Sequence, residues 1–164
     1  ALKITHRYGI QFSLNNVTGF PTETRELAMD TVELNRNLDS DNQNLYAFVP
    51  FHGTPLRRLC EEQGLVTPET ITRACTDKPM LIMPQYTQEE IEGLIKCFVL
   101  YVKFPKNRWP DIKRAESNSQ EGNKIYKELK QEYVEKYLPK NNNNLEESSS
   151  ASDLEYGVEQ SDVC

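Results

Sequence analysis

The first 65 residues repeat one pattern of hydrophobic and polar positions: a short apolar stretch, a loop and a helix. In the first unit, apolar residues alternate with polar ones through residues 10–14, which predicts a strand that runs into a loop at Gly19. Hydroxyl and acidic side chains at residues 22–26 then favour a helix N-terminus. Four apolar residues continue at helical spacing: Leu27, Val32, Leu34 and Leu38. Before this unit, residues 1–8 followed by Gly9 predict the last turns of a helix.

The second unit begins at residues 45–49, which are apolar at nearly every position. Such a run is typical of a parallel strand covered on both faces. After the loop at residues 50–53, Thr54 is placed to cap a helix that has Pro55 at its first position and ends near Gly64. Two consecutive units of this kind predict a βαβα arrangement and an α/β fold.

Two parallel strands need a wider sheet to bury them, because an open pair leaves ladder groups and apolar faces exposed. We therefore expect partner strands from outside this sequence, or pieces that do not fold natively alone. The sequence opens on Ala1 without the basic-then-apolar pattern of a secretory signal, so we expect its start to be internal.

The sequence after residue 65 predicts helices followed by a disordered C-terminal tail. Thr67 and Pro68 predict a short helix through residue 75, and residues 80–83 form an apolar stretch without an assigned role. A capping-box spacing at Thr87 starts an amphipathic helix that runs to Pro105, and a further helix is predicted over 124–138. Residues 140–164, rich in Asn, Ser and acidic side chains, are predicted to be disordered. The predicted regions are 1–65, 66–139 and 140–164.

Charge and composition limit the classes of partner that we expect the chain to bind. The chain of 164 residues has a net charge of -6, and its Lys and Glu residues are interspersed, so we expect no nucleic-acid partner. No stretch approaches the roughly 20 apolar residues that cross a bilayer, so we expect no membrane partner and a soluble, cytoplasmic protein. The cysteines lack metal-ligand spacing and are interpreted as structural thiols of a reducing compartment: Cys60, Cys75, Cys97 and Cys164.

Two ordered segments carry a family resemblance. Residues 9–26 contain Asn-Val-Thr-Gly-Phe-Pro-Thr-Glu-Thr-Arg-Glu at 16–26, and residues 31–36 and 48–56 contain Thr-Val-Glu-Leu-Asn-Arg and Phe-Val-Pro-Phe-His-Gly-Thr-Pro-Leu. They resemble the fifth-strand region, the next helix, the sixth strand and the following loop of radical S-adenosylmethionine enzymes. The class most resembled carries an N-terminal cobalamin-binding domain. The chain departs from the family at Thr22, where Gly is usual, and at Phe51-His52, where many relatives have Tyr-Pro.

The resemblance implies the C-terminal portion of a partial (β/α) barrel, made of two βα units and followed by a mainly helical region. Such a barrel holds a 4Fe-4S cluster and S-adenosylmethionine at the C-terminal ends of its strands. In the family, reductive cleavage of the cofactor gives a 5′-deoxyadenosyl radical that abstracts hydrogen from an organic substrate. By resemblance, the cofactor-binding residues lie in the two strand-end loops: Asn16, Val17, Thr18, Gly19, Phe51, His52 and Gly53.

The family's Cys-x3-Cys-x2-Cys triplet is absent, so this chain has no expected metal ligand and should be inactive alone. The cluster ligands, and a cobalamin domain that makes cobalamin a candidate cofactor, are expected in a missing N-terminal half of the same protein. That half and a small-molecule or other organic substrate are the expected partners. Methyl transfer, ring rearrangement and other radical steps all use this scaffold, so the reaction type stays open. The alternative function is a noncatalytic helical interaction module that retains a vestigial barrel segment.

Several side chains have both a functional and a structural interpretation. Asn16 and Thr18 share one face of the predicted strand, where the family match favours ligand contact in the barrel lumen. Glu23 either fixes the loop, meets a ligand or, as the preferred interpretation, caps the helix. His52 without a carboxylate or nucleophile partner is interpreted as structural. Core packing is expected for the aromatic residues Tyr101, Phe104 and Trp109, and a solvated charged face for Arg108, Lys113 and Arg114.

Overall fold

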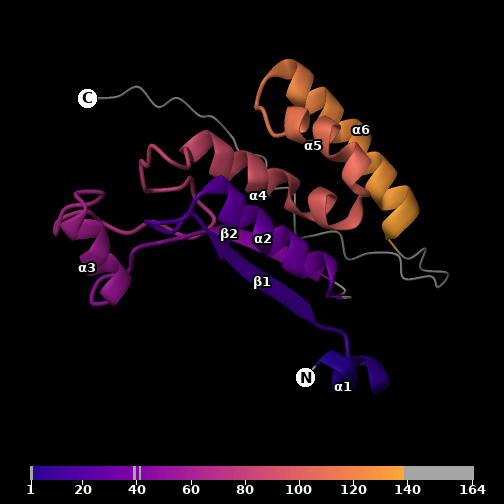
Figure 1. Ribbon diagram of the computed structural model, residues 1–164, viewed down its shortest axis with the longest axis horizontal. Helices are drawn as coiled ribbons and strands as arrows, with labels where there is room; N and C mark the ends of the chain where they lie inside the picture. Colours follow the sequence, from indigo (N-terminus) through magenta and orange to yellow (C-terminus); the bar gives the residue numbers. More distant parts are fainter. Residues whose placement is uncertain (1, 39, 41, 139–164) are drawn as a thin grey trace, which may run out of the picture.

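The computed structural model describes residues 2–38, 40 and 42–138, and within them it shows an α/β arrangement with two parallel strands (Figure 1). Strand β1 (Ser13–Thr18) pairs in parallel with β2 (Asn42–Ala47), with Ser13 opposite Asn42 and Thr18 opposite Ala47. A helix connects the two strands, as parallel pairing requires. The predicted α/β fold and the two parallel strands are confirmed, but the predicted bounds are wrong: β1 begins three residues after the start of the predicted stretch 10–14, and β2 begins three residues before the start of 45–49.

Three helices accompany these strands: α1 (Leu2–Arg7), α2 (Arg25–Arg36) and α3 (Pro55–Glu62). Thr24 caps α2 and Thr54 caps α3, each accepting a hydrogen bond from a backbone N–H three residues on. The predicted apolar stripe of α2 is only partly right. Its buried residues are Ala28, Val32 and Asn35, whereas Leu27 and Leu34 are 53% and 58% exposed. Tertiary contacts, rather than hydropathy alone, therefore set which face of α2 is buried.

Residues 63–87 contain turns and no helix, so the helix predicted from Thr67 to Cys75 is wrong. The physical reason lies in Arg57 of α3, whose side chain is 2% exposed. Its guanidinium Nη2 donates to the carbonyl oxygens of Thr67, Pro68 and Thr70 at 2.6, 3.3 and 3.1 Å. Carbonyls that converge on one guanidinium cannot point along a common helix axis, so this stretch wraps around α3 instead.

The second half is helical. Its elements are α4 (Gln88–Lys103), the 3-10 turn η1 (Lys106–Arg108), α5 (Trp109–Ala115) and α6 (Gln120–Tyr137). The capping box at Thr87 is formed with Glu90, which confirms the predicted start of α4. The α5 helix was not predicted, because its seven residues show too short a pattern. Ser119 caps α6, which begins at Gln120, four residues before the predicted start.

One hydrophobic cluster joins the predicted regions 1–65 and 66–139. It contains Val32 of α2 and Leu45 of β2 together with residues of α4, α5 and α6. Tyr101 and Phe104 are buried and Trp109 packs against the cluster, which confirms core packing for the three aromatic residues. Arg108, Lys113 and Arg114 form ion pairs with acidic neighbours, as a solvated charged face does. The helical region therefore packs directly against the strand units.

In the described part of the chain, no helix combines the length and the apolar character that crossing a bilayer demands. Cys60 and Cys97 are buried and Cys75 is exposed. Cys164 and the tail predicted to be disordered lie outside the described residues.

Candidate functional site

The two strands end side by side, which brings the turns that follow them to one edge of the sheet. The N–H of Phe48 donates to the carbonyl oxygen of Thr18 at 2.7 Å and so extends the ladder past β2. The rings of Phe20 and Phe48 then pack with their centroids 4.9 Å apart. Parallel α/β proteins bind ligands at this end of the strands, so these turns are the candidate site.

The turn after β1 is held by Glu23. Its Oε2 accepts hydrogen bonds from the Thr18 hydroxyl at 2.9 Å, from the Gly19 N–H and from the Phe20 N–H at 3.4 Å. Gly19 has a φ of +88°, a conformation that side chains with a Cβ rarely adopt. Of the interpretations of Glu23, loop fixing is confirmed and helix capping is wrong, because Thr24 caps α2.

The turn after β2 is held from α3. The Thr54 hydroxyl donates to the carbonyl oxygen of Phe51 at 2.8 Å, and Arg57 Nη1 donates to that of Pro50 at 3.2 Å. Gly53 has a φ of +82°. Phe51 is 57% exposed, and His52 and Gly53 are also exposed. The turn thus presents an aromatic ring and an imidazole to solvent from a fixed backbone.

The predicted lumen orientation of Asn16 and Thr18 is wrong. Asn16 Nδ2 donates to Asn35 Oδ1 of α2 at 3.1 Å, and Asn35 Nδ2 donates to Asn16 Oδ1 at 2.9 Å. The Thr18 hydroxyl lies 3.3 Å from that of Tyr86 and is buried. Both side chains therefore face the helices, on the same side of β1 as Leu14, and their polar atoms are engaged within the protein.

The opposite face of the sheet carries the alternate residues. Asn15 and Val17 of β1 are exposed, with Val17 at 43%, and Asn44 Nδ2 of β2 donates to Asn15 Oδ1 across the strands at 2.9 Å. The sequence analysis did not identify Asn15 as exposed on this face, although the sequence contained a signal. Leu14 is apolar, so its face of β1 is the one that helices cover, and Asn15 lies on the other face. Of the predicted site residues, Val17, Phe51, His52 and Gly53 are accessible at this edge, while Asn16 and Thr18 are not available through their side chains.

The site offers no metal ligands of its own. Within residues 2–38, 40 and 42–138, no three His, Cys, Asp or Glu side chains come together as a metal site would require. Burial also raises the pKa of the Cys97 thiol to about 12, which keeps it protonated and unlike a metal-binding thiolate.

The pKa of Tyr86 makes the stability of the folded protein depend on pH. Burial raises its pKa to about 12, although the hydrogen bond to Thr18 opposes the shift. The folded protein therefore keeps a proton that the unfolded chain releases near pH 10, so this contribution to stability is complete below about pH 10 and is lost as the pH rises toward about 12. We expect Tyr86→Phe to show a shallower loss of its urea midpoint between about pH 10 and pH 12. Parallel losses in the variant and the parent would contradict this role.

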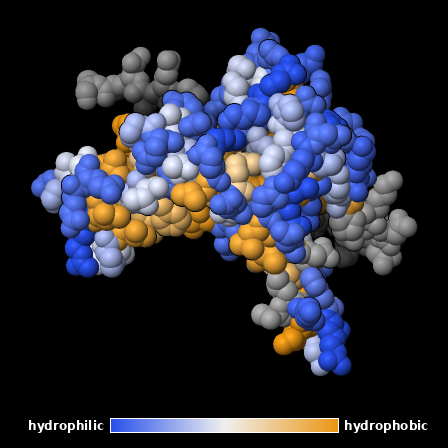
Figure 2. Space-filling model, in the orientation of Figure 1, coloured by the Kyte–Doolittle hydropathy of each residue, from blue (hydrophilic) through white to orange (hydrophobic). Residues whose placement is uncertain are grey.

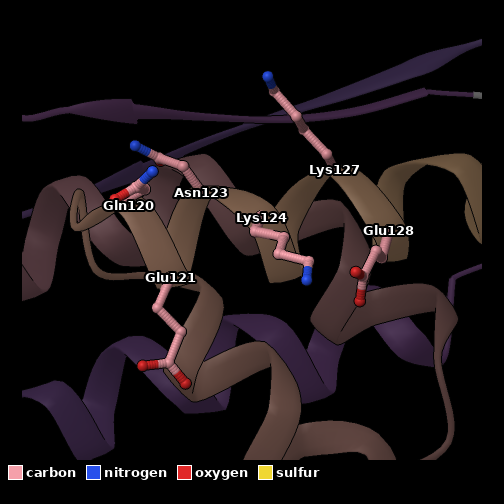
Figure 3. A pocket seen from close by; sticks show the side chains of 6 residues that line it. All are labelled: Gln120, Glu121, Asn123, Lys124, Lys127 and Glu128. Carbon is pink, nitrogen blue, oxygen red and sulfur yellow. The ribbon is translucent and has the colours of Figure 1, made fainter.

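A surface depression on α6 is not a second candidate site. It is lined by Gln120, Glu121, Asn123, Lys124, Lys127 and Glu128, which all belong to one helix (Figure 3). Figure 3 shows acidic and basic side chains mixed and spread along the helix rather than converging on a common point. This arrangement is typical of a solvated helix face.

Comparisons with known proteins find a partial similarity. No protein-family model matches the chain, and no solved structure matches it significantly. The chain is similar to an uncharacterized methyltransferase of Pyrococcus horikoshii, with 26% identity over 113 residues. These residues make up 68% of this chain and 25% of the relative, so the chain spans about a quarter of the length of the curated protein that it matches.

Proposed function

We propose that the chain is the C-terminal part of a radical S-adenosylmethionine enzyme and forms one side of the cofactor site in a (β/α) barrel. The observation that carries the proposal is the edge formed by the C-terminal ends of β1 and β2 and the turns after them, where β1 exposes Val17 and the turn after β2 exposes Phe51 beside fixed backbone. These turns are the segments that resemble the family. The P. horikoshii relative is named as a methyltransferase, an enzyme class that commonly uses S-adenosylmethionine as its methyl donor.

The residues present fit the nucleoside end of S-adenosylmethionine. Adenine has flat apolar faces and polar edges, and an exposed aliphatic side chain and an exposed ring beside a structured backbone suit both. Val17 and Phe51 would contact the base, while Gly53 lets the backbone approach it closely because it has no Cβ and nothing lies within 4 Å of that position. Together with an iron-sulfur cluster, S-adenosylmethionine supplies a 5′-deoxyadenosyl radical. The part of this chain is to bind the nucleoside and to exclude water from it.

The 4Fe-4S cluster does not fit this chain. Cys60 of α3 and Cys97 of α4 are buried, and Cys75 is exposed in the loop after α3. Iron-sulfur clusters are held by cysteine thiolates that converge. Under the proposal the ligands, and any cobalamin domain, belong to polypeptide outside this chain. Methyl transfer to an organic substrate is the reaction that the relative's name favours.

A substitution at Val17 tests the cofactor contact. In the complete protein, we expect Val17→Asp to weaken S-adenosylmethionine binding by about tenfold or more, because a carboxylate beside the base must lose hydration, at a cost above about 1.4 kcal/mol. Equilibrium dialysis with methyl-labelled cofactor measures this effect. The matched control is Ile71→Asp, which changes an equally apolar residue that is 83% exposed and remote in sequence from both turns. Equal binding by the two variants would argue against the site.

A further inference from the structure

The start of α4 lies against the turn that follows β1 (Figure 1). The hydroxyl of Tyr86, which directly precedes the N-cap of α4, is 3.3 Å from that of Thr18 at the end of β1. The neighbouring Gln85 donates from Nε2 to the carbonyl oxygen of Pro21 at 3.1 Å. The turn is thus held by side chains that lie 68 and 64 positions further along the chain.

A buried isoleucine of α4 fills the space beside Gly19. A Cβ added at Gly19 would lie 3.2 Å from Cδ1 of Ile91, which is closer than ordinary van der Waals contact between carbon atoms. Ile91 is 0% exposed, so its side chain has little room to give way. The Cβ side of Gly19 therefore belongs to the contact with α4, and a ligand must approach this turn from another side.

The sequence signals that begin α4 also determine which side chains meet the turn. Thr87 and Glu90 form the capping box of the helix. Tyr86 and Ile91 occupy the position before the N-cap and the fourth helical position, where apolar side chains form a hydrophobic staple. Both side chains are fully buried. The geometry of the helix start is therefore fixed locally, and it carries both contacts to the turn with it.

The far end of the turn is also bound to the helical region. Arg25, the first residue of α2, donates to the carbonyl oxygen of Glu90 at 3.4 Å and pairs with Glu116 at 2.5 Å. On the opposite face of β1, Val17 is 43% exposed. Figure 2 shows apolar surface between α3 and the strands, where the two turns lie. The helical region thus supports the turn from behind and leaves accessible apolar surface at the strand ends.

From these contacts we propose that Gln85, Tyr86 and Ile91 are positioning residues, through which α4 holds the Gly19 turn in the conformation that receives the nucleoside. The inference rests on the proposed function and adds to it a role for the helical region, which sets the shape of one side of the cofactor site. A preformed turn binds more tightly than a mobile one, because binding then orders less of the backbone. Loosening these contacts should weaken binding even though none of the three residues touches the cofactor.

Two isoleucine variants of the complete protein test the contact with Gly19. Ile91→Val removes Cδ1, the atom nearest to Gly19, whereas Ile112→Val makes the same change at an equally buried residue of α5. Both should lower the urea midpoint to a similar extent. Only Ile91→Val is expected to speed amide exchange at Gly19 and Phe20, by about threefold or more, as measured by mass spectrometry of peptides. Equally fast exchange in the two variants would overturn the inference.

Two glutamine variants test the consequence for the cofactor. Gln85→Leu removes the hydrogen bond to Pro21, whereas Gln88→Leu removes a bond of the same kind to the carbonyl oxygen of Pro79, at 2.6 Å, within the same segment. We expect Gln85→Leu to raise the dissociation constant of S-adenosylmethionine about three- to tenfold, and Gln88→Leu to change it less than about twofold. At saturating S-adenosylmethionine, 5′-deoxyadenosine formation by Gln85→Leu should equal that of the parent, whereas a slower reaction would contradict a positioning role.

The two sets of variants distinguish this inference from the proposed function. Tight binding by the parent together with equal binding by Gln85→Leu and Gln88→Leu would contradict the inference alone. A parent protein that does not bind S-adenosylmethionine would contradict the proposed function, and the role in cofactor binding with it. The exchange comparison needs no cofactor, so it decides separately whether α4 holds the turn.

Discussion

Replacing Arg57 with methionine is expected to lower the free energy of unfolding by about 3–5 kcal/mol. Its buried guanidinium pairs with Glu61 through Nε at 2.6 Å and donates to the backbone on both sides of α3. Methionine keeps most of the side-chain volume but leaves these buried carbonyl oxygens without a donor, and unsatisfied buried groups are costly. The loss should also loosen the Pro50–Gly53 turn, because Pro50 is one of the partners.

The neighbouring residue supplies the matched control. Arg58 is exposed on the same helix, so Arg58→Met changes the same charge with little burial, and we expect a loss within about 0.5 kcal/mol. Urea unfolding followed by far-ultraviolet circular dichroism measures both variants. Similar losses for Arg57→Met and Arg58→Met would show that the carbonyl contacts of Arg57 contribute little.

Replacing Glu116 with leucine is expected to cost about 3 kcal/mol. The carboxylate is 6% exposed and pairs with Arg25 of α2 at 2.5 Å and with Lys113 at 2.9 Å. Its Oε1 also accepts from the hydroxyl of Tyr101 at 2.7 Å. Without Glu116, the mostly buried Arg25 loses its counter-charge and the Tyr101 hydroxyl loses its acceptor. Because Arg25 begins α2 and Glu116 follows α5, the substitution weakens the connection between the strand units and the helical region.

Trp109, the sole tryptophan of the chain, reports this effect from the helical side of the core. Its fluorescence should show Glu116→Leu unfolding at a lower urea concentration. The control is Glu121→Leu, which removes a carboxylate that is 72% exposed and paired at the surface with Arg114, at an expected cost of about 1 kcal/mol or less. Adding Arg25→Met to Glu116→Leu should recover part of the loss, since no buried charge then stays unpaired. A fully additive double variant would contradict a direct coupling of the two residues.

Local signals predicted the elements where capping residues mark their ends. Thr54, Pro55 and Gly64 define α3, and the capping box at Thr87 defines the start of α4. The same kind of signal failed at Thr67, because the carbonyl groups of that stretch are drawn to Arg57, a tertiary contact that no local pattern contains. Hydropathy likewise misassigned Leu27 and Leu34 of α2, whose side of the helix is uncovered in the described residues.

For the candidate site, the sequence located the right turns but misassigned some side chains. The alternation of β1 places Asn16 and Thr18 with Leu14, and this order already contained the information that they face the helices. The role of Glu23 in the turn could not be predicted from spacing, because it depends on the fold of the Gly19 turn. Contacts at the strand-end turns come from residues up to 68 positions apart, as with Thr18 and Tyr86, and only the folded chain brings them together.

The most direct test of the proposed function is reductive cleavage of S-adenosylmethionine by the complete protein. The protein translated from the longer reading frame is purified without oxygen, supplied with iron and sulfide, and mixed with S-adenosylmethionine and a low-potential reductant. We expect 5′-deoxyadenosine to form, and to form more slowly with Val17→Asp than with Ile71→Asp. No 5′-deoxyadenosine from a protein that has incorporated a 4Fe-4S cluster, or an upstream sequence without a cysteine triplet, would contradict the account.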